Sequence, residues 1–119
     1  MGIKAYAAKW FAKTVNRQTL KWAANPEGTQ HDVFRALIGQ AKSTLFGEDH
    51  DFIRIKTHRD FKEAVPIRDY EALKPYIQKI IEGAENVLWP GKPIYFAKTS
   101  GTTSGIKYIP ITKESMPYQ

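Results

Sequence analysis

One run of small and hydroxyl-bearing residues has the composition of a phosphate-binding loop. Its glycines, Gly101 and Gly105, allow backbone conformations closed to other residues, so that successive amides can point at one anion. Hydroxyl groups add hydrogen-bond donors at short reach, and Lys107 adds a mobile positive charge. The candidate phosphate-binding residues are Thr99, Ser100, Gly101, Thr102, Thr103, Ser104, Gly105 and Lys107. Composition alone leaves open the alternative of a flexible hairpin loop without a ligand.

The run does not fit a Walker A loop, which is the obvious alternative among nucleotide-binding motifs. A Walker A loop ends in Gly-Lys-Ser or Gly-Lys-Thr and is followed by a helix. Here Gly105 is followed by Ile106, Lys107 and Tyr108, and the next residues have the pattern of a strand. Walker chemistry is therefore excluded.

The sequence carries no pattern of protein metal ligands. It has no cysteine, which excludes disulfides and cysteine-based zinc sites. His31, His50 and His58 lack the spacing that places two ligands on one helix face. The acidic residues Glu48, Asp49 and Asp51 lack the spacing and the glycine of an EF-hand, so we interpret them as a solvated loop. For His50 we predict a structural hydrogen bond to loop backbone, and no residue is assigned a catalytic role.

The first part of the chain is predicted to be helical. Apolar residues recur with helical period over residues 3–24, and Pro26 ends this helix because it disfavours helical geometry in Asn25. A second apolar stripe predicts a helix from about Thr29, which Gly47 ends in a left-handed turn. A short linker over residues 48–56 follows.

Two further helices are predicted from their capping residues. Thr57 would cap a helix over residues 58–64. Asp69 would cap a helix over residues 70–82 that Gly83 ends, with either a kink or a restart at Pro75.

Beyond Gly83 the pattern changes to turns and strands. Residues 94–97 and 107–111 are predicted strands on either side of the candidate loop, and Thr112 would cap a final helix that begins at Lys113. The predicted fold class is α+β, mostly helical with one strand-loop-strand hairpin. We divide the chain into a basic amphipathic N-terminal helix (1–26), a helical region (27–90) and a truncated strand-loop-strand region (91–119).

Positive charge is concentrated in the first helix. The net charge is +6, and residues 1–26 contain no acid but hold Lys4, Lys9, Lys13, Arg17 and Lys21. We interpret this stripe as a solvated helix face, which leaves open an alternative function, a small basic helical module that binds an anionic surface such as a membrane or nucleic acid. No apolar run approaches the roughly 18 residues that a membrane span needs, and no signal sequence is recognisable, so we expect a cytoplasmic protein.

The loop also resembles a known family signature. Thr99 to Lys107 is similar to the first signature of the adenylate-forming superfamily, whose usual pattern is Thr-Ser-Gly-Thr-Thr-Gly followed by Pro-Lys. This chain inserts Ser104 before the second glycine and lacks the proline, which fits the auxin-responsive acyl-acid amido synthetases of plants and their bacterial relatives. Further marks of that branch, in its order, are Thr44-Leu45-Phe46-Gly47, His50, Phe52, Phe61, Val65-Pro66, Tyr70, Leu73, Pro75-Tyr76-Ile77, Gly83, Gly91, Pro93, Phe96, Pro110 and Thr112.

The resemblance implies an ATP-dependent ligase. A carboxylic acid would be adenylated with release of pyrophosphate, and an amine, typically an amino acid, would then take the acyl group. Ser100, Gly101, Thr102 and Thr103 would contact the ATP phosphates, Lys107 would help neutralise them, and Mg²⁺ would bridge phosphate oxygens. The partners implied are ATP, a carboxylic acid and an amine or amino acid, with no nucleic acid. We expect the chain to be the N-terminal part of a larger α/β enzyme, inactive by itself and prone to self-association through exposed apolar faces.

Overall fold

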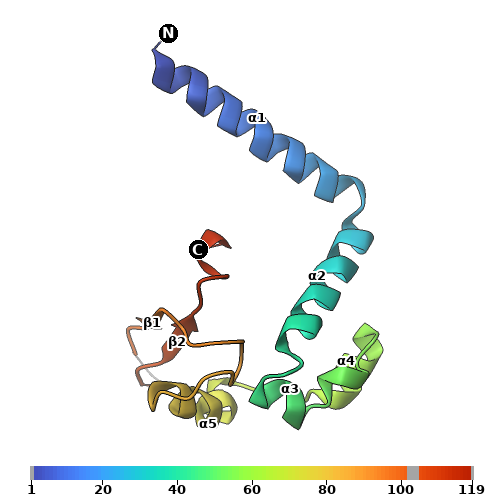
Figure 1. The fold of residues 1–119 in the computed structure, drawn as a ribbon, viewed down its shortest axis with the longest axis vertical. Helices are drawn as coiled ribbons and strands as arrows, with labels where there is room; N and C mark the ends of the chain where they lie inside the picture. The colour runs from blue at the N-terminus through green and yellow to red at the C-terminus, as the bar shows by residue number, and fades with distance from the viewer. Residues whose placement is uncertain (1, 102–104, 119) are drawn as a thin grey trace. The chain divides into compact units, whose positions relative to one another are not determined.

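The computed structural model of the protein describes residues 2–101 and 105–118. The chain divides into two parts, residues 1–35 and 36–119, and each part is described here by itself. In chain order the described elements are α1, α2, α3, the 3₁₀ turn η1, α4, α5, the strands β1 and β2, and the 3₁₀ turn η2 (Figure 1). The predicted α+β class, mostly helical with one antiparallel hairpin, is confirmed.

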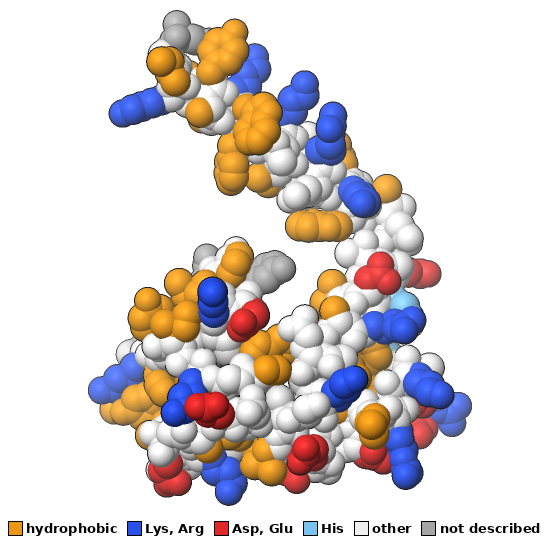
Figure 2. Space-filling view, in the orientation of Figure 1, with side chains coloured by type: hydrophobic (Ala, Val, Ile, Leu, Met, Phe, Trp, Pro, Cys, Tyr) orange, Lys and Arg blue, Asp and Glu red, His pale blue; other side chains and the backbone are white. Residues whose placement is uncertain are grey.

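The first part holds α1 (Ile3–Ala24) and the start of α2 (Pro26–Ala41). The predicted bounds of the first helix are confirmed, but the second begins at Pro26 rather than Thr29, because proline suits the first position of a helix. The Asn25 side chain joins the two helices by accepting a hydrogen bond of 3.1 Å from the Gly28 amide. Within α1 no residue is buried, and Figure 2 shows basic and hydrophobic side chains along it. The described residues include no helix long and apolar enough to cross a membrane.

The second part corrects the prediction that one helix runs to Gly47. Helix α2 ends at Ala41, and Gly47 lies inside a separate short helix, α3 (Leu45–Asp49). The physical reason is Thr44, whose hydroxyl donates to the Ala41 carbonyl over 2.7 Å and accepts from the Gly47 amide over 3.0 Å. One side chain therefore ends α2 and caps α3.

The region predicted as a linker is more ordered than expected, because α3 occupies its start and η1 (Phe52–Arg54) follows. Helix α4 (His58–Ala64) begins as predicted at Thr57, which forms a capping box with Asp60. The carboxylate of Asp60 accepts two backbone hydrogen bonds from residues 56 and 57, and these lower its pKa.

Helix α5 (Tyr70–Ile81) is capped by Asp69 and ends before Gly83, as predicted. Gly83 has a φ of +99°, which an L side chain rarely adopts. The helix continues through Pro75, so the predicted restart at Pro75 is wrong. Asp69 already caps the start of the helix by accepting a hydrogen bond from the Ala72 amide. This cap precedes Pro75 in the chain, so the helix needs no second start at Pro75.

Strands β1 (Tyr95–Lys98) and β2 (Tyr108–Ile111) pair antiparallel, with Lys98 opposite Tyr108, and flank the candidate loop as predicted. The predicted helix from Lys113 is wrong, since a turn leads into η2 (Met116–Tyr118). Thr112 does accept from the Ser115 amide over 3.3 Å, but the Ser115 hydroxyl also donates back to the Thr112 carbonyl over 2.9 Å. These side-chain bonds close a turn in place of a helix.

The core of the second part gathers around α3. Val87 is 3% exposed and Thr44 is fully buried. Leu45 and Phe46 donate their amides to the carbonyls of Asn86 and Val87 over 2.8 Å and 2.9 Å. The segment before β1 thus satisfies the first amides of α3. The remaining buried apolar residues are Ile38, Ala41, Phe52, Ile55, Ile77 and Ile80.

Two glycines allow a matched test of this packing. A Cβ at Gly47 would overlap the Ala41 carbonyl, whereas one at Gly39 in α2 would meet nothing within 4 Å. We expect Gly47→Ala to reduce the free energy of unfolding by about 1–3 kcal/mol, because backbone must move. Gly39→Ala should instead raise it by up to about 1 kcal/mol, because alanine favours helix. Urea denaturation followed by circular dichroism measures both, and equal effects would contradict the close contact at Gly47.

Candidate phosphate-binding site

Two hydrogen bonds between Thr99 and Lys107 close the candidate loop at its base. The Thr99 amide donates to the Lys107 carbonyl over 3.0 Å, and the Lys107 amide donates to the Thr99 hydroxyl over 3.2 Å. Thr99, a predicted phosphate-binding residue, therefore closes the loop by accepting with its hydroxyl oxygen, and its hydroxyl hydrogen can still be donated to another group. The predicted residues Thr102, Thr103 and Ser104 lie outside the described residues.

Both glycines have conformational reasons to be glycine. Gly105 has a φ of +79°, a conformation that other residues rarely adopt. A Cβ at Gly101 would overlap the Gly105 carbonyl group and come too close to the Ile106 nitrogen. The backbone of Gly101 thus lies directly against the far side of the loop. Only glycine at position 101 permits this close approach of the two backbone segments, which fits a tight turn of the kind that gathers amides around an anion.

A hollow at the loop is lined by Lys98, Thr99, Ser100, Gly101 and Ile106. Within the described residues, the amides of Ser100 and Gly101 donate to no other group. The structure therefore brings three of the predicted residues together with the positive charge of Lys98. Sequence reasoning missed Lys98 because it lies in the strand before the glycine-rich run, and it left Ile106 out of the site, although Ile106 lies inside that run, because its side chain has no hydrogen-bond donor.

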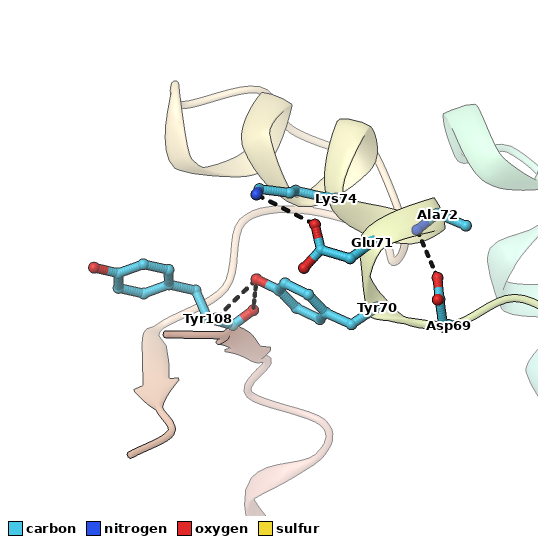
Figure 3. Close-up of polar contacts among 6 residues, drawn as sticks. All are labelled: Asp69, Tyr70, Glu71, Ala72, Lys74 and Tyr108. Carbon is cyan, nitrogen blue, oxygen red and sulfur yellow. Dashed lines mark hydrogen bonds and ion pairs between the residues drawn. The ribbon is translucent and has the colours of Figure 1, made fainter. Parts of the chain in front are cut away.

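Tyr70, at the start of α5, contacts the strand that leaves the loop (Figure 3). Its hydroxyl accepts from the Tyr108 amide over 2.9 Å and lies 3.4 Å from the Tyr108 carbonyl, a long contact for a hydroxyl donor. The Lys107 ammonium lies 5.6 Å from the centre of the Tyr70 ring, within the range of a cation–π interaction. The predicted site residue Lys107 is therefore held by α5, which no sequence spacing indicated.

His50 and Arg68 form a second polar contact in the same part of the chain. His50 is 7% exposed, and its Nδ1 lies 2.7 Å from the Phe46 carbonyl. Arg68 donates from Nη1 to Nε2 of His50 over 2.8 Å. Because arginine can only donate, this contact assigns Nε2 as the acceptor and Nδ1 as the donor to the Phe46 carbonyl. The predicted structural role of His50 is confirmed, with backbone of α3 rather than of a loop as its partner.

The acidic residues after Gly47 have individual partners. Tyr76 donates its hydroxyl to Asp49 over 2.7 Å, and Asp51 forms an exposed ion pair with Arg54. Burial raises the pKa of the Tyr76 hydroxyl, and the hydrogen bond and charge of Asp49 raise it further. Tyr76 therefore stays a hydrogen-bond donor at neutral pH. No group of three or more histidine, aspartate or glutamate residues that could hold a metal ion occurs among residues 2–101 and 105–118.

Comparison with known proteins yields one family and a consistent set of relatives. The model of the GH3 family N-terminal domain matches residues 16–118. The chain is 47% identical over 58 residues to the probable indole-3-acetic acid-amido synthetase GH3.13 of Oryza sativa subsp. japonica, covering 47% of this chain and 12% of that protein. It is 31% identical over 94 residues to the indole-3-acetic acid-amido synthetase GH3.2 of Arabidopsis thaliana, covering 77% and 17%.

A third relative is the jasmonoyl–L-amino acid synthetase JAR6 of Nicotiana attenuata, 43% identical over 58 residues, which cover 47% of this chain and 10% of that protein. The chain thus spans between 10% and 17% of the length of these three relatives. No solved structure matches the chain.

The contact between Arg68 and His50 can be tested against an exposed arginine. We expect Arg68→Met to reduce the free energy of unfolding by about 1–3 kcal/mol, because a buried ring nitrogen loses its donor. Arg59→Met removes the ion pair between Arg59 and Glu63. The Arg59 side chain is 87% exposed. That control should change stability by less than about 0.5 kcal/mol. Thermal unfolding of both variants measures the difference, and losses of equal size would show that Arg68 contributes no more than a surface pair.

Proposed function

The chain belongs to the GH3 family, and we propose on this premise that the complete gene product is an ATP-dependent ligase that adenylates a carboxylic acid and joins it to an amine or amino acid. The relatives that match are named amido synthetases of indole-3-acetic acid and a synthetase of jasmonoyl–amino acid conjugates. The observation that carries the proposal is the glycine-closed loop at Gly101 and Gly105, which lies inside the family match.

In this proposal the loop binds the triphosphate of the substrate ATP. The amides of Ser100 and Gly101 and the hydroxyls of Thr102, Thr103 and Ser104 supply donors, and Lys107 supplies positive charge. Donors that are fixed before the reaction stabilise the developing charge of the departing pyrophosphate without having to reorganise. Mg²⁺, where bound, would neutralise phosphate oxygens and take its ligands from them and from water.

The surrounding residues divide into those that bind and those that shape the loop. Thr99 and Gly105 shape the loop, and Gly101 allows its own backbone to lie against that of Gly105. Lys98 lines the same hollow and adds a second positive charge beside it. We place the reaction in the cytoplasm, where ATP is available. The chain has no cysteine and forms no disulfide, which is compatible with that reducing compartment.

The proposal predicts ATP-dependent pyrophosphate exchange by the complete gene product. The substrates to be offered are indole-3-acetic acid, jasmonic acid and other carboxylic acids, each with a set of amino acids. Lys107→Met should raise the KM for ATP about tenfold or more, because a hydrogen bond to a charged group contributes about 1.5–3 kcal/mol. Gly101→Ala should have at least as large an effect, because its methyl group would overlap the Gly105 backbone and force the loop to move.

Two controls carry the same chemical changes away from the loop. Lys113→Met removes an exposed lysine beyond β2, and Gly39→Ala adds a methyl group where nothing lies within 4 Å. Both should leave the KM for ATP within about twofold, since they alter no group near the loop. The assignment of the loop to ATP would be refuted if pyrophosphate exchange were absent with every acid. It would also be refuted if all four variants reduced that exchange equally.

We expect the 119-residue chain by itself to release no pyrophosphate from ATP with any carboxylic acid. It covers at most 17% of the three relatives compared above, so most of the residues that would enclose the acid and the amine lie elsewhere. A pyrophosphate assay of the purified chain, with the complete gene product as the positive control, makes the comparison. Turnover by the chain alone would show that residues 1–119 contain a complete active site.

A further inference from the structure

The hairpin that carries the loop needs support from outside its own two strands. An isolated two-stranded hairpin is marginally stable in water. All four residues of β1 are exposed, and hydrophobic side chains of both strands reach the surface, among them Ile109 at 41% exposure. The geometry of the loop therefore depends on whatever holds the strands.

Tyr70 makes such a contact at the outer edge of β2. Thr99 and Lys107 form a hydrogen-bonded pair, so the amide and carbonyl of the next residue, Tyr108, face away from β1. Pro110, the next residue that faces this edge, has no amide hydrogen. The Tyr108 amide is thus the one donor that β2 offers at this edge, and the Tyr70 hydroxyl accepts it over 2.9 Å.

The same tyrosine contacts the loop residue just before Tyr108. The Lys107 ammonium lies 5.6 Å from the centre of the Tyr70 ring, and Lys107 is partly buried. One side chain therefore holds the backbone of β2 with its hydroxyl and the charge of Lys107 with its ring. The hydroxyl can be removed while the ring is kept, so the two contributions can be separated in two steps.

Helix α5 fixes the position from which Tyr70 acts. Asp69 caps the helix by accepting from the Ala72 amide over 2.9 Å (Figure 3). Arg68 is held in turn by His50. Tyr70 therefore follows one residue that caps its own helix and one that is tied to His50.

We propose that Tyr70 is a positioning residue for ATP: it holds β2 and Lys107 so that the far end of the loop is placed before the triphosphate arrives. This inference rests on the proposed function of the loop. Tyr70 contacts Lys107 and Tyr108, and its effect on ATP passes through those two residues.

The test uses the complete gene product with two substitutions at this position. Tyr70→Phe removes the hydroxyl and keeps the ring, and we expect it to raise the KM for ATP about threefold to tenfold, the range of one neutral hydrogen bond. Tyr70→Leu also removes the ring and should raise the KM further, by about another twofold to fivefold, the range of an exposed cation–π contact. The KM for the carboxylic acid should change less than twofold in both, because the hydrogen bonds and the ring contact of Tyr70 within the described part of the chain are with Tyr108 and Lys107.

Tyr76 gives a control on the same helix, since its hydroxyl also forms a hydrogen bond, which it donates to Asp49. Tyr76→Phe should leave the KM for ATP unchanged. Hydrogen exchange of the peptide that contains β2 provides a readout independent of turnover. Exchange should be faster in Tyr70→Phe than in the wild type and unchanged in Tyr76→Phe.

A double-mutant cycle tests the route through Lys107. If Tyr70 acts on ATP by placing Lys107, the effects of Tyr70→Leu and Lys107→Met on the KM for ATP will not add. Full additivity, or a Tyr70→Phe enzyme with wild-type KM for ATP, would overturn the positioning role. A wild type that neither exchanges pyrophosphate nor binds ATP would overturn the proposed function and this inference with it. The Tyr70→Phe variant keeps the ring, so it reports even where Tyr70→Leu fails to fold.

Discussion

The structure of residues 36–119 depends on the hydrogen bonds that satisfy the first amides of α3. A helix leaves its first amides unpaired, and a helix of five residues is far too short to be stable alone. Here the Thr44 hydroxyl and the carbonyls of Asn86 and Val87 accept those amides. Tertiary hydrogen bonds thus stabilise α3 in place of further helical turns. Val87, which makes one of them, is the most deeply buried of the described apolar residues.

This arrangement explains how a marginal hairpin can carry a defined loop. The segment that satisfies α3 leads directly into β1, so one strand is tied to the helices through the chain itself. The other strand is tied by Tyr70, which accepts from the Tyr108 amide. The loop lies between two strands with separate attachments, and bonds between Thr99 and Lys107 close its base.

Sequence reasoning succeeded where the physical cause was local. Thr57 and Asp69 each cap a helix within three residues, and Gly83 supplies a positive φ. Gly47 has the same residue type but a different cause, because it is glycine to admit the Ala41 carbonyl rather than to adopt a left-handed turn. The sequence shows that a side chain is absent at Gly47, and only the packing of α2 against α3 shows why.

In the candidate site, too, features with a local cause were predictable from the sequence, and features that depend on tertiary contacts were not. Gly101 and Gly105 were predictable because a tight loop limits which residues can form it. The contacts of Arg68 with His50 and of Tyr70 with Tyr108 span 18 and 38 residues, and no periodicity joins positions so far apart. Tyr70 and Tyr76 look equivalent in sequence, since both are tyrosines of one amphipathic helix, yet one hydroxyl accepts from a strand edge and the other donates to a carboxylate. What distinguishes them is the partner that the fold brings to each, so residues that hold a loop in place can be found only after the elements around it have been placed.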